Sequence, residues 1–123
     1  MIQGLRTVIY KVPDLAAAKA WYSRVLGIEP YFSEPFYVGF QVGGFELGLD
    51  PDMGSAVPGG GVTAYWGVAD AGTALAEMLA RGAQAHEAVQ DVGGGIRIAA
   101  VKDPFGNVLG IVENPHFSIA GVR

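Results

Sequence analysis

Residues 7–27 read TVIYKVPDLAAAKAWYSRVLG, and residues 63–82 read TAYWGVADAGTALAEMLARG. The two stretches are versions of one pattern, set 56 positions apart. In each, a run rich in β-branched and aromatic residues ends in Val-x-Asp, an Ala- and Leu-rich run follows, and a glycine closes it. The first run is typical of a strand and the second of a helix. The repeat therefore predicts a strand followed by a helix twice, with helices near 14–26 and 70–81.

The ends of both predicted helices carry the residues that helix ends favour. Asp14 and Asp70 suit the N-cap, because a carboxylate there can accept from the free N–H groups of the first turn. Gly27 and Gly82 suit the left-handed position that follows the last turn. Start and stop signals thus agree in both copies of the repeat.

The sequence after each helix is typical of a β-hairpin. FYVGFQVGGFELGLD (36–50) has two glycines at its centre, which suit a two-residue primed turn. That turn predicts the following pairs: Val42 with Phe45, Gln41 with Glu46, Phe40 with Leu47, Gly39 with Gly48 and Tyr37 with Asp50. GIRIAAVKDPFGNVLGIVE (95–113) predicts a second hairpin, with a type I turn at residues 103–106.

These patterns predict two modules of strand–helix–strand–strand(–strand), residues 1–52 and 60–115. The segment between them, 51–61, is rich in Gly and Pro, which is typical of a linker. Residues 116–123 are predicted to form a tail. Each module alone is too small to cover the helix-facing side of its sheet, so we expect the modules to assemble into a single domain over residues 1–123.

The composition excludes several classes of protein. Hydrophobic residues make up 50% and charged residues 16% of the chain, which excludes intrinsic disorder. Eight Lys and Arg against twelve Asp and Glu give a net charge of −4 with no basic run, so neither nucleic acid nor a membrane is an expected partner. The lack of cysteine excludes disulfides, thiolate metal sites and a cysteine nucleophile. No stretch resembles a signal peptide or a transmembrane helix, so we expect a cytoplasmic protein.

Two motifs resemble those of the vicinal oxygen chelate superfamily, which includes glyoxalase I, bleomycin-resistance proteins and extradiol dioxygenases. The first is V-x-D-L-x-x-A-x-x-[FW]-Y-x-x-[VL]-L-G at residues 12–27, and the second is D-P-x-G-N at residues 103–107. Their order, spacing and duplication cover nearly the whole chain. The resemblance implies an α+β fold of two βαβββ modules whose curved mixed sheets face each other around a cleft. It also implies a homodimer.

Enzymes of this superfamily hold a metal in the cleft, with a His, Gln or Glu on each first strand and a carboxylate on each last strand. Carried onto this sequence, the first-strand positions are Thr7 and Thr63, and the last-strand positions are Gly48 and Gly110. Hydroxyls and glycines offer too little charge for zinc, nickel or Fe(II). The residues at these four positions therefore predict a cleft without a metal or another cofactor.

Strand alternation gives an independent prediction of the residues that line the cleft. The large residues Val8, Tyr10 and Val12 share one face of the first strand and belong under the helix, so the opposite face belongs to the cleft. The predicted ligand-binding residues are Thr7, Ile9, Lys11, Tyr37, Gln41, Glu46, Gly48, Thr63, Tyr65, Arg97 and Gly110. The glycines leave room for a bulky planar small molecule, and aromatic rings can stack on it.

Several of these residues have a second interpretation. Tyr37 and Tyr65 are equally compatible with ordinary half-buried strand positions. Lys11 can form a local pair with Glu46 across the sheet, and such pairs contribute little. Glu46 is also the one candidate for a catalytic general base, provided that the cleft is dry.

The remaining aromatic residues and histidines have less specific expectations. Trp21, Tyr22 and Trp66 are expected in the core. His86 and His116 are the only other metal-ligand candidates, and neither lies in a ligand-spaced motif, so each is expected on the surface or in a loop.

Three functions are compatible with these observations. The first is a metal-free binding protein of the glyoxalase/bleomycin-resistance type that holds an aromatic or hydrophobic ligand, such as an antibiotic-like compound. The second is a lyase or isomerase of the glyoxalase/dioxygenase type, with no metal or with a non-standard site that uses Glu46. The third is a protein with a vestigial cleft that associates with other proteins. Metal analysis separates the first two, and ligand-dependent melting separates the first from the third.

Overall fold

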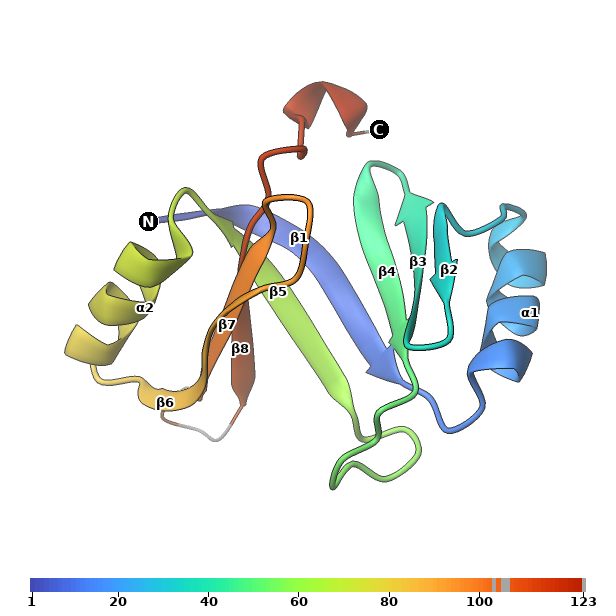
Figure 1. Cartoon of the computed structure of the whole chain (residues 1–123), viewed down its shortest axis with the longest axis horizontal. Helices are drawn as coiled ribbons and strands as arrows, with labels where there is room; N and C mark the ends of the chain where they lie inside the picture. The colour runs from blue at the N-terminus through green and yellow to red at the C-terminus, as the bar shows by residue number, and fades with distance from the viewer. Residues whose placement is uncertain (103, 105–106, 123) are drawn as a thin grey trace. The chain divides into compact units, whose positions relative to one another are not determined.

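The structure is a computed structural model that describes residues 1–102, 104 and 107–122. In chain order the described elements are β1 (Ile2–Lys11), α1 (Leu15–Leu26), β2 (Phe32–Glu34), β3 (Tyr37–Val42), β4 (Phe45–Asp50), β5 (Val62–Val68), α2 (Ala71–Ala80), β6 (Gln84–Asp91), β7 (Arg97–Lys102), β8 (Val108–Glu113) and a 3-10 turn at Ile119–Gly121 (Figure 1). This order is βαβββ twice. The predicted α+β class with two such modules is confirmed.

The chain packs into two compact units. The α1 unit comprises Thr7–Val62 together with the end of the chain from Ile119, and the α2 unit comprises Met1–Arg6 together with Thr63–Ser118. Both units therefore use part of β1. The last described residues of the chain pack with the α1 unit, although they follow the last strand of the α2 unit.

The sheet of the α1 unit has the strand order β2-β3-β4-β1. β3 pairs antiparallel with both β2 and β4, and β1 pairs parallel with β4. The β3–β4 ladder pairs Val42 with Phe45 and Gly39 with Gly48, as the sequence predicts. Gly43 and Gly44 form the turn with φ of 63° and 98°, conformations that a primed turn requires. The turn therefore sets which side chains share a face.

One face of this sheet packs against α1 (Figure 1). Val38, Phe40 and Leu49 are fully buried there. The partly buried residues packed around them are Tyr10, Val12, Leu15, Ala18, Tyr22, Leu26 and Leu47. Strand neighbours of these residues point the other way, because side chains alternate along a strand. We call that opposite side the helix-distal face of the unit.

The sheet of the α2 unit has the strand order β5-β8-β7-β6. β5 and β8 are parallel, and the other neighbours are antiparallel, with register shifts along β6. The buried core against α2 consists of Val68, Ala74, Met78, Ala99, Val101 and Ile111. This arrangement repeats that of the α1 unit, with a helix on one face and a helix-distal face on the other.

Both helices begin and end where the sequence predicts. The carboxylate of Asp14 accepts from the Ala17 N–H at 3.0 Å, and that of Asp70 accepts from the Thr73 N–H at 2.8 Å. This capping hydrogen bond is the main reason that the pKa of Asp70 lies below its usual value. Gly27 is left-handed, with a φ of 70°.

Trp21 lies outside the core, and one predicted turn is only partly described by the structure. Trp21, expected in the core, is 50% exposed and packs edge-on against the ring of Tyr22, which does join the core. The predicted turn at residues 103–106 lies mostly outside the described residues.

Among the described residues, neither helix has the length and apolar character needed to cross a membrane.

Candidate functional site

Glu46 is held by two tyrosine hydroxyls on the helix-distal face of the α1 unit. It lies on β4, opposite Thr7 of β1 and Gln41 of β3. Tyr37 Oη donates to Glu46 Oε2 at 2.5 Å, and Tyr31 Oη donates to Glu46 Oε1. Both carboxylate oxygens therefore accept from phenols, in a geometry that fixes the carboxylate and orients both rings.

The rings of the same tyrosines cover two glycines that pair with each other. A Cβ on Gly48 would collide with Tyr37 Oη and lie 2.8 Å from Tyr37 Cε1. A Cβ on Gly39 would lie 3.0 Å from Tyr31 Cε1. A side chain at Gly48 would displace the Tyr37 ring from Glu46, whereas one at Gly39 would press on the Tyr31 ring. The space that the sequence assigned to a ligand at Gly48 is therefore filled by Tyr37.

The environment of Tyr31 raises the pKa of its phenol. Burial is the largest cause, followed by the hydrogen bond to Glu46 and the negative charge of Glu46. The neutral phenol is thus favoured in the folded state, so its stabilising contribution is complete below the unfolded pKa of about 10 and is lost as the pH rises above it.

We expect Glu46→Gln to lower the pKa of Tyr31 toward its ordinary value, because the substitution removes the carboxylate charge. The shift should be partial, since burial remains. Ultraviolet absorbance of tyrosinate during an alkaline titration measures it. Glu34→Gln, which removes an exposed carboxylate from β2, is the matched control and should leave the titration unchanged. Identical titrations for wild type and Glu46→Gln would contradict the hydrogen-bonded arrangement.

Lys11 pairs with Asp50 rather than with Glu46. Lys11 Nζ lies 2.8 Å from Asp50 Oδ2, and these residues are directly opposite each other on β1 and β4. The expected pair with Glu46 is wrong because the parallel register places Thr7, not Lys11, opposite Glu46. Ile9 of the predicted set lies between them, opposite Gly48.

In the α2 unit, the Tyr65 ring covers a glycine of the last strand, as the Tyr37 ring does in the α1 unit. Tyr65 of β5 lies directly opposite Gly110 of β8. A Cβ on Gly110 would lie 2.6 Å from Tyr65 Cδ1 and 2.9 Å from Tyr65 Cγ. The ring therefore fills the space above this glycine. Thr63 is two residues before Tyr65 on the same face and is partly buried.

Arg6, which the sequence analysis does not single out, crosses this same face. A Cβ on Gly67 would lie 2.6 Å from Arg6 Nε, and Gly67 shares a face of β5 with Tyr65. The guanidinium carbon of Arg6 lies 3.7 Å from the centre of the Phe117 ring. The missing side chain at Gly67 admits the arginine, and Phe117 holds it by a cation–π contact.

Arg97 lies on the helix-bearing face, which differs from the expectation. It shares that face with Ala99 and Val101, which are buried against α2. Arg97 Nη1 lies 3.4 Å from Glu113 Oε1, and the same oxygen accepts from the Ala71 N–H at 2.9 Å. Arg97 and Glu113 thus tie β7 and β8 to the start of α2, away from Tyr65.

The strand registers make the last-strand positions of the two units equivalent. Gly48 lies opposite Ile9, Gly110 lies opposite Tyr65, and Ile9 and Tyr65 are separated by the 56-residue offset of the repeat. Neither glycine can supply a ligand, and tyrosine rings cover both. Over residues 1–102, 104 and 107–122, no three His, Asp or Glu side chains gather where they could hold a metal ion. The donor set does not fit a divalent cation.

The two histidines lie in unrelated places. His86 is exposed on β6, and His116 Nε2 lies 2.6 Å from the carbonyl oxygen of Gly94, in the loop before β7. His116 therefore anchors a loop.

The family model described as the Glyoxalase/Bleomycin resistance protein/Dioxygenase superfamily matches residues 4–111. The chain belongs to this superfamily. The match includes both copies of the sequence repeat and both tyrosine-covered glycines. A search of curated proteins finds no match.

Solved structures show the same fold at low sequence identity. Methylmalonyl-CoA epimerase from Streptomyces coelicolor, in complex with 2-nitronate-propionyl-CoA, is 20% identical, with a TM-score of 0.77 over 96% of this chain and 99% of that chain. Methylmalonyl-CoA epimerase from Mycobacterium tuberculosis is 22% identical, with a TM-score of 0.70 over 90% and 87% of the two chains. A superfamily member from Vibrio splendidus 12B01 is 18% identical, with a TM-score of 0.65 over 89% and 99%. These likenesses establish the fold alone.

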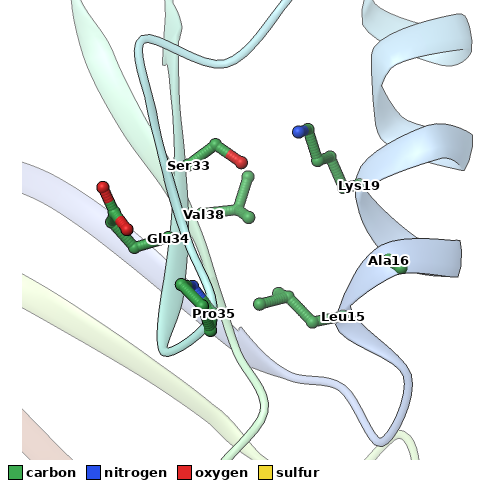
Figure 2. A pocket seen from close by; sticks show the side chains of 7 residues that line it. All are labelled: Leu15, Ala16, Lys19, Ser33, Glu34, Pro35 and Val38. Atoms are coloured by element: carbon green, nitrogen blue, oxygen red, sulfur yellow. The ribbon is translucent and has the colours of Figure 1, made fainter.

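A separate hollow of about 370 Å³ lies between α1 and β2 (Figure 2). Its lining residues are Leu15, Ala16, Lys19, Ser33, Glu34, Pro35 and Val38. Figure 2 shows Lys19 extending from the helix toward Ser33, while Glu34 points away from the helix. None of the predicted ligand-binding residues lines it.

Within the α1 unit, the structure brings Glu46 and Tyr37 of the predicted set together and adds Tyr31. Within the α2 unit it brings Tyr65 and Gly110 together and adds Arg6. A lone glycine inside a strand often marks the close approach of another group, so Gly67 was the signal for Arg6. That Thr7, Thr63, Gly48 and Gly110 meet around one space stays a prediction.

Proposed function

We propose that this chain is a metal-free small-molecule-binding protein of the glyoxalase/bleomycin-resistance type, and that it holds an aromatic or hydrophobic ligand against its partly buried tyrosine rings. The observation that carries the proposal is the pair of tyrosine-covered glycines at Gly48 and Gly110. At two of the four positions where superfamily enzymes place metal ligands, Gly48 and Gly110, a tyrosine ring lies over a glycine. Such rings are stacking surfaces for a planar ligand.

The ligand-binding residues proposed for the α1 unit are Thr7, Ile9, Lys11, Tyr31, Tyr37, Gln41, Glu46 and Gly48. Those proposed for the α2 unit are Arg6, Thr63, Tyr65 and Gly110. Tyr37 and Tyr65 would stack on the ligand, whereas the glycines serve to seat these rings. We further propose that the protein works as a cytoplasmic homodimer. Light scattering of the purified protein measures its oligomeric state and tests the second part of this proposal.

We expect Tyr65→Ala to weaken binding of an aromatic compound about 3- to 10-fold, because offset stacking contributes about 0.5–1.5 kcal/mol beyond area burial. Tyr65→Phe retains the ring and should bind within about 2-fold of wild type. Titration calorimetry with a panel of aromatic, glycopeptide-like and aldehyde compounds measures the affinities, and elemental analysis of the same samples measures metal content. The proposal fails if no compound in the panel binds, or if binding compounds also bind Tyr65→Ala equally well.

One observation favours a second function, a lyase or isomerase that transfers a proton without a metal. Glu46 and the hydroxyls of Tyr31 and Tyr37 form a connected set of proton donors and acceptors. Such a set could remove a proton from a bound substrate and return it. Turnover of glyoxalase- or epimerase-type substrates that persists in chelator and disappears in Glu46→Gln would support catalysis. Turnover that requires added metal would instead indicate a non-standard metal site.

A further inference from the structure

The Arg6 side chain lies on the helix-distal face of the α2 unit. It crosses β5 at Gly67, two residues from Tyr65, and its guanidinium lies against the ring of Phe117. Two residues of a strand span about 6.7 Å, so the charged group and the Tyr65 position are close neighbours on one face. The side chain is only partly buried.

Most hydrogen-bonding capacity of this guanidinium has no partner among the described residues. The group has five N–H donors, all in its plane. The guanidinium carbon lies over the Phe117 ring, and Arg6 Nη1 donates to the carbonyl oxygen of Leu5 at 3.2 Å. The salt bridges between described residues involve Lys11, Arg81 and Arg97, so no described carboxylate neutralises Arg6.

We propose that the α2-unit site takes an aromatic carboxylate, with its carboxylate paired to Arg6 and its ring against Tyr65. This inference rests on the proposed function and names its substrate class. A planar guanidinium matches a carboxylate through two parallel hydrogen bonds, which a neutral amide cannot reproduce. The contact with Phe117 holds the guanidinium in place before the ligand arrives, so less side-chain entropy is lost on binding.

Gly67 supports this assignment independently of charge. In a strand interior, glycine lowers stability because it gains no side-chain packing. Here any side chain would displace Arg6, since a Cβ would lie 2.9 Å from the guanidinium carbon. The glycine at this position of β5 therefore leaves the space that the Arg6 side chain occupies.

The experiment compares naphthoate with the neutral naphthamide by calorimetry, in wild type and variants. We expect wild type to bind naphthoate at least about 10-fold more tightly than naphthamide, because hydrogen bonds to charged groups are the strong ones. Arg6→Gln should lower the affinity for naphthoate to about that for naphthamide and so remove this preference. Arg6→Lys keeps the charge but loses the two parallel N–H donors of the guanidinium, so it should keep only part of the preference. Arg24→Gln, which removes an exposed arginine from α1, is the charge-matched control and should behave as wild type.

Gly67→Ala provides a second route if Arg6→Gln does not fold. The added methyl group should displace the guanidinium without removing its charge, and we expect the preference for naphthoate to fall about as far as in Arg6→Gln. The inference is overturned if wild type binds both compounds equally, or if both variants keep the preference; in those cases aromatic binding itself stands. If wild type binds no aromatic compound in any panel, the proposed function and this inference both fail.

Discussion

Phe40→Ala should lower the free energy of unfolding by about 3–5 kcal/mol. Phe40 is 0% exposed and belongs, with Val38 and Leu49, to the core that packs under α1. Truncation would remove the transfer free energy of the ring and leave a cavity that a sheet, fixed by its ladder, can close only in part. Because small domains have a total stability of about 5–15 kcal/mol, a loss of this size would unfold a sizeable fraction of the protein at physiological temperature.

Phe36→Ala is the matched control for Phe40→Ala. The Phe36 side chain is 67% exposed and contacts the ring of Phe32, so its truncation should cost about 1 kcal/mol or less. Urea denaturation measures both variants, and a change in midpoint at an unchanged slope indicates a change in stability. Equal losses for the two variants would show that the core under α1 is not packed as described.

Gly44→Ala should both destabilise the fold and release the end of the chain. Gly44 has a φ of 98°, and an added Cβ would collide with the carbonyl oxygen of Gly121 and lie 2.5 Å from Val122 Cα. These are backbone atoms, which cannot move aside as the tip of a side chain can. The left-handed conformation alone costs a non-glycine residue about 1–2 kcal/mol, and the collision adds to this.

Gly82→Ala separates the two effects of Gly44→Ala. Gly82 has a φ of 99°, but no atom lies within 4 Å of the Cβ position, so only the backbone strain applies. We expect Gly44→Ala to lower the melting temperature more than Gly82→Ala. Limited digestion with a carboxypeptidase should remove residues after Ser118 faster from Gly44→Ala than from wild type or Gly82→Ala. Equal digestion rates in all three proteins would contradict docking of the chain end on this turn.

The register of the β3–β4 hairpin is predictable from local sequence. Two successive glycines allow the positive φ values of a primed turn, and such a turn leaves one way to pair the flanking strands. The pairs at Val42–Phe45 and Gly39–Gly48 follow directly. Which faces are buried also follows, because the strand positions that carry large apolar residues form the core.

Local sequence does not decide the face on which Arg97 lies or the ion-pair partner of Lys11. Alternation along β7 sorts residues into two sets, but it does not say which set meets the helix. The structure places the set of Ala99 and Val101 against α2, and Arg97 goes with it. For Lys11, the partner depends on the register of the parallel β1–β4 pair. No turn connects those two strands, so local sequence does not fix their register.

Tyr31 was missed for a related reason. It precedes β2, a strand of three residues whose pattern is too short to recognise, and only the pairing of β2 with β3 brings the Tyr31 ring over Gly39. The Tyr31 hydroxyl then reaches Glu46, 15 positions away in the sequence.

The two-module fold follows from local signals, because the repeat, the helix caps and the Gly43-Gly44 turn act within a few residues. The lack of a ligating group at the positions equivalent to metal ligands also follows from the sequence, since residue identity alone decides this. Tertiary contacts were needed to show that tyrosine rings cover Gly48 and Gly110, that Glu46 accepts from two phenols, and that Arg6 crosses Gly67. The contacts of Tyr31, Tyr65 and Arg6 join segments of the chain that no tight turn connects, so strand pairing sets their distances, whereas Tyr37 meets Glu46 within one hairpin.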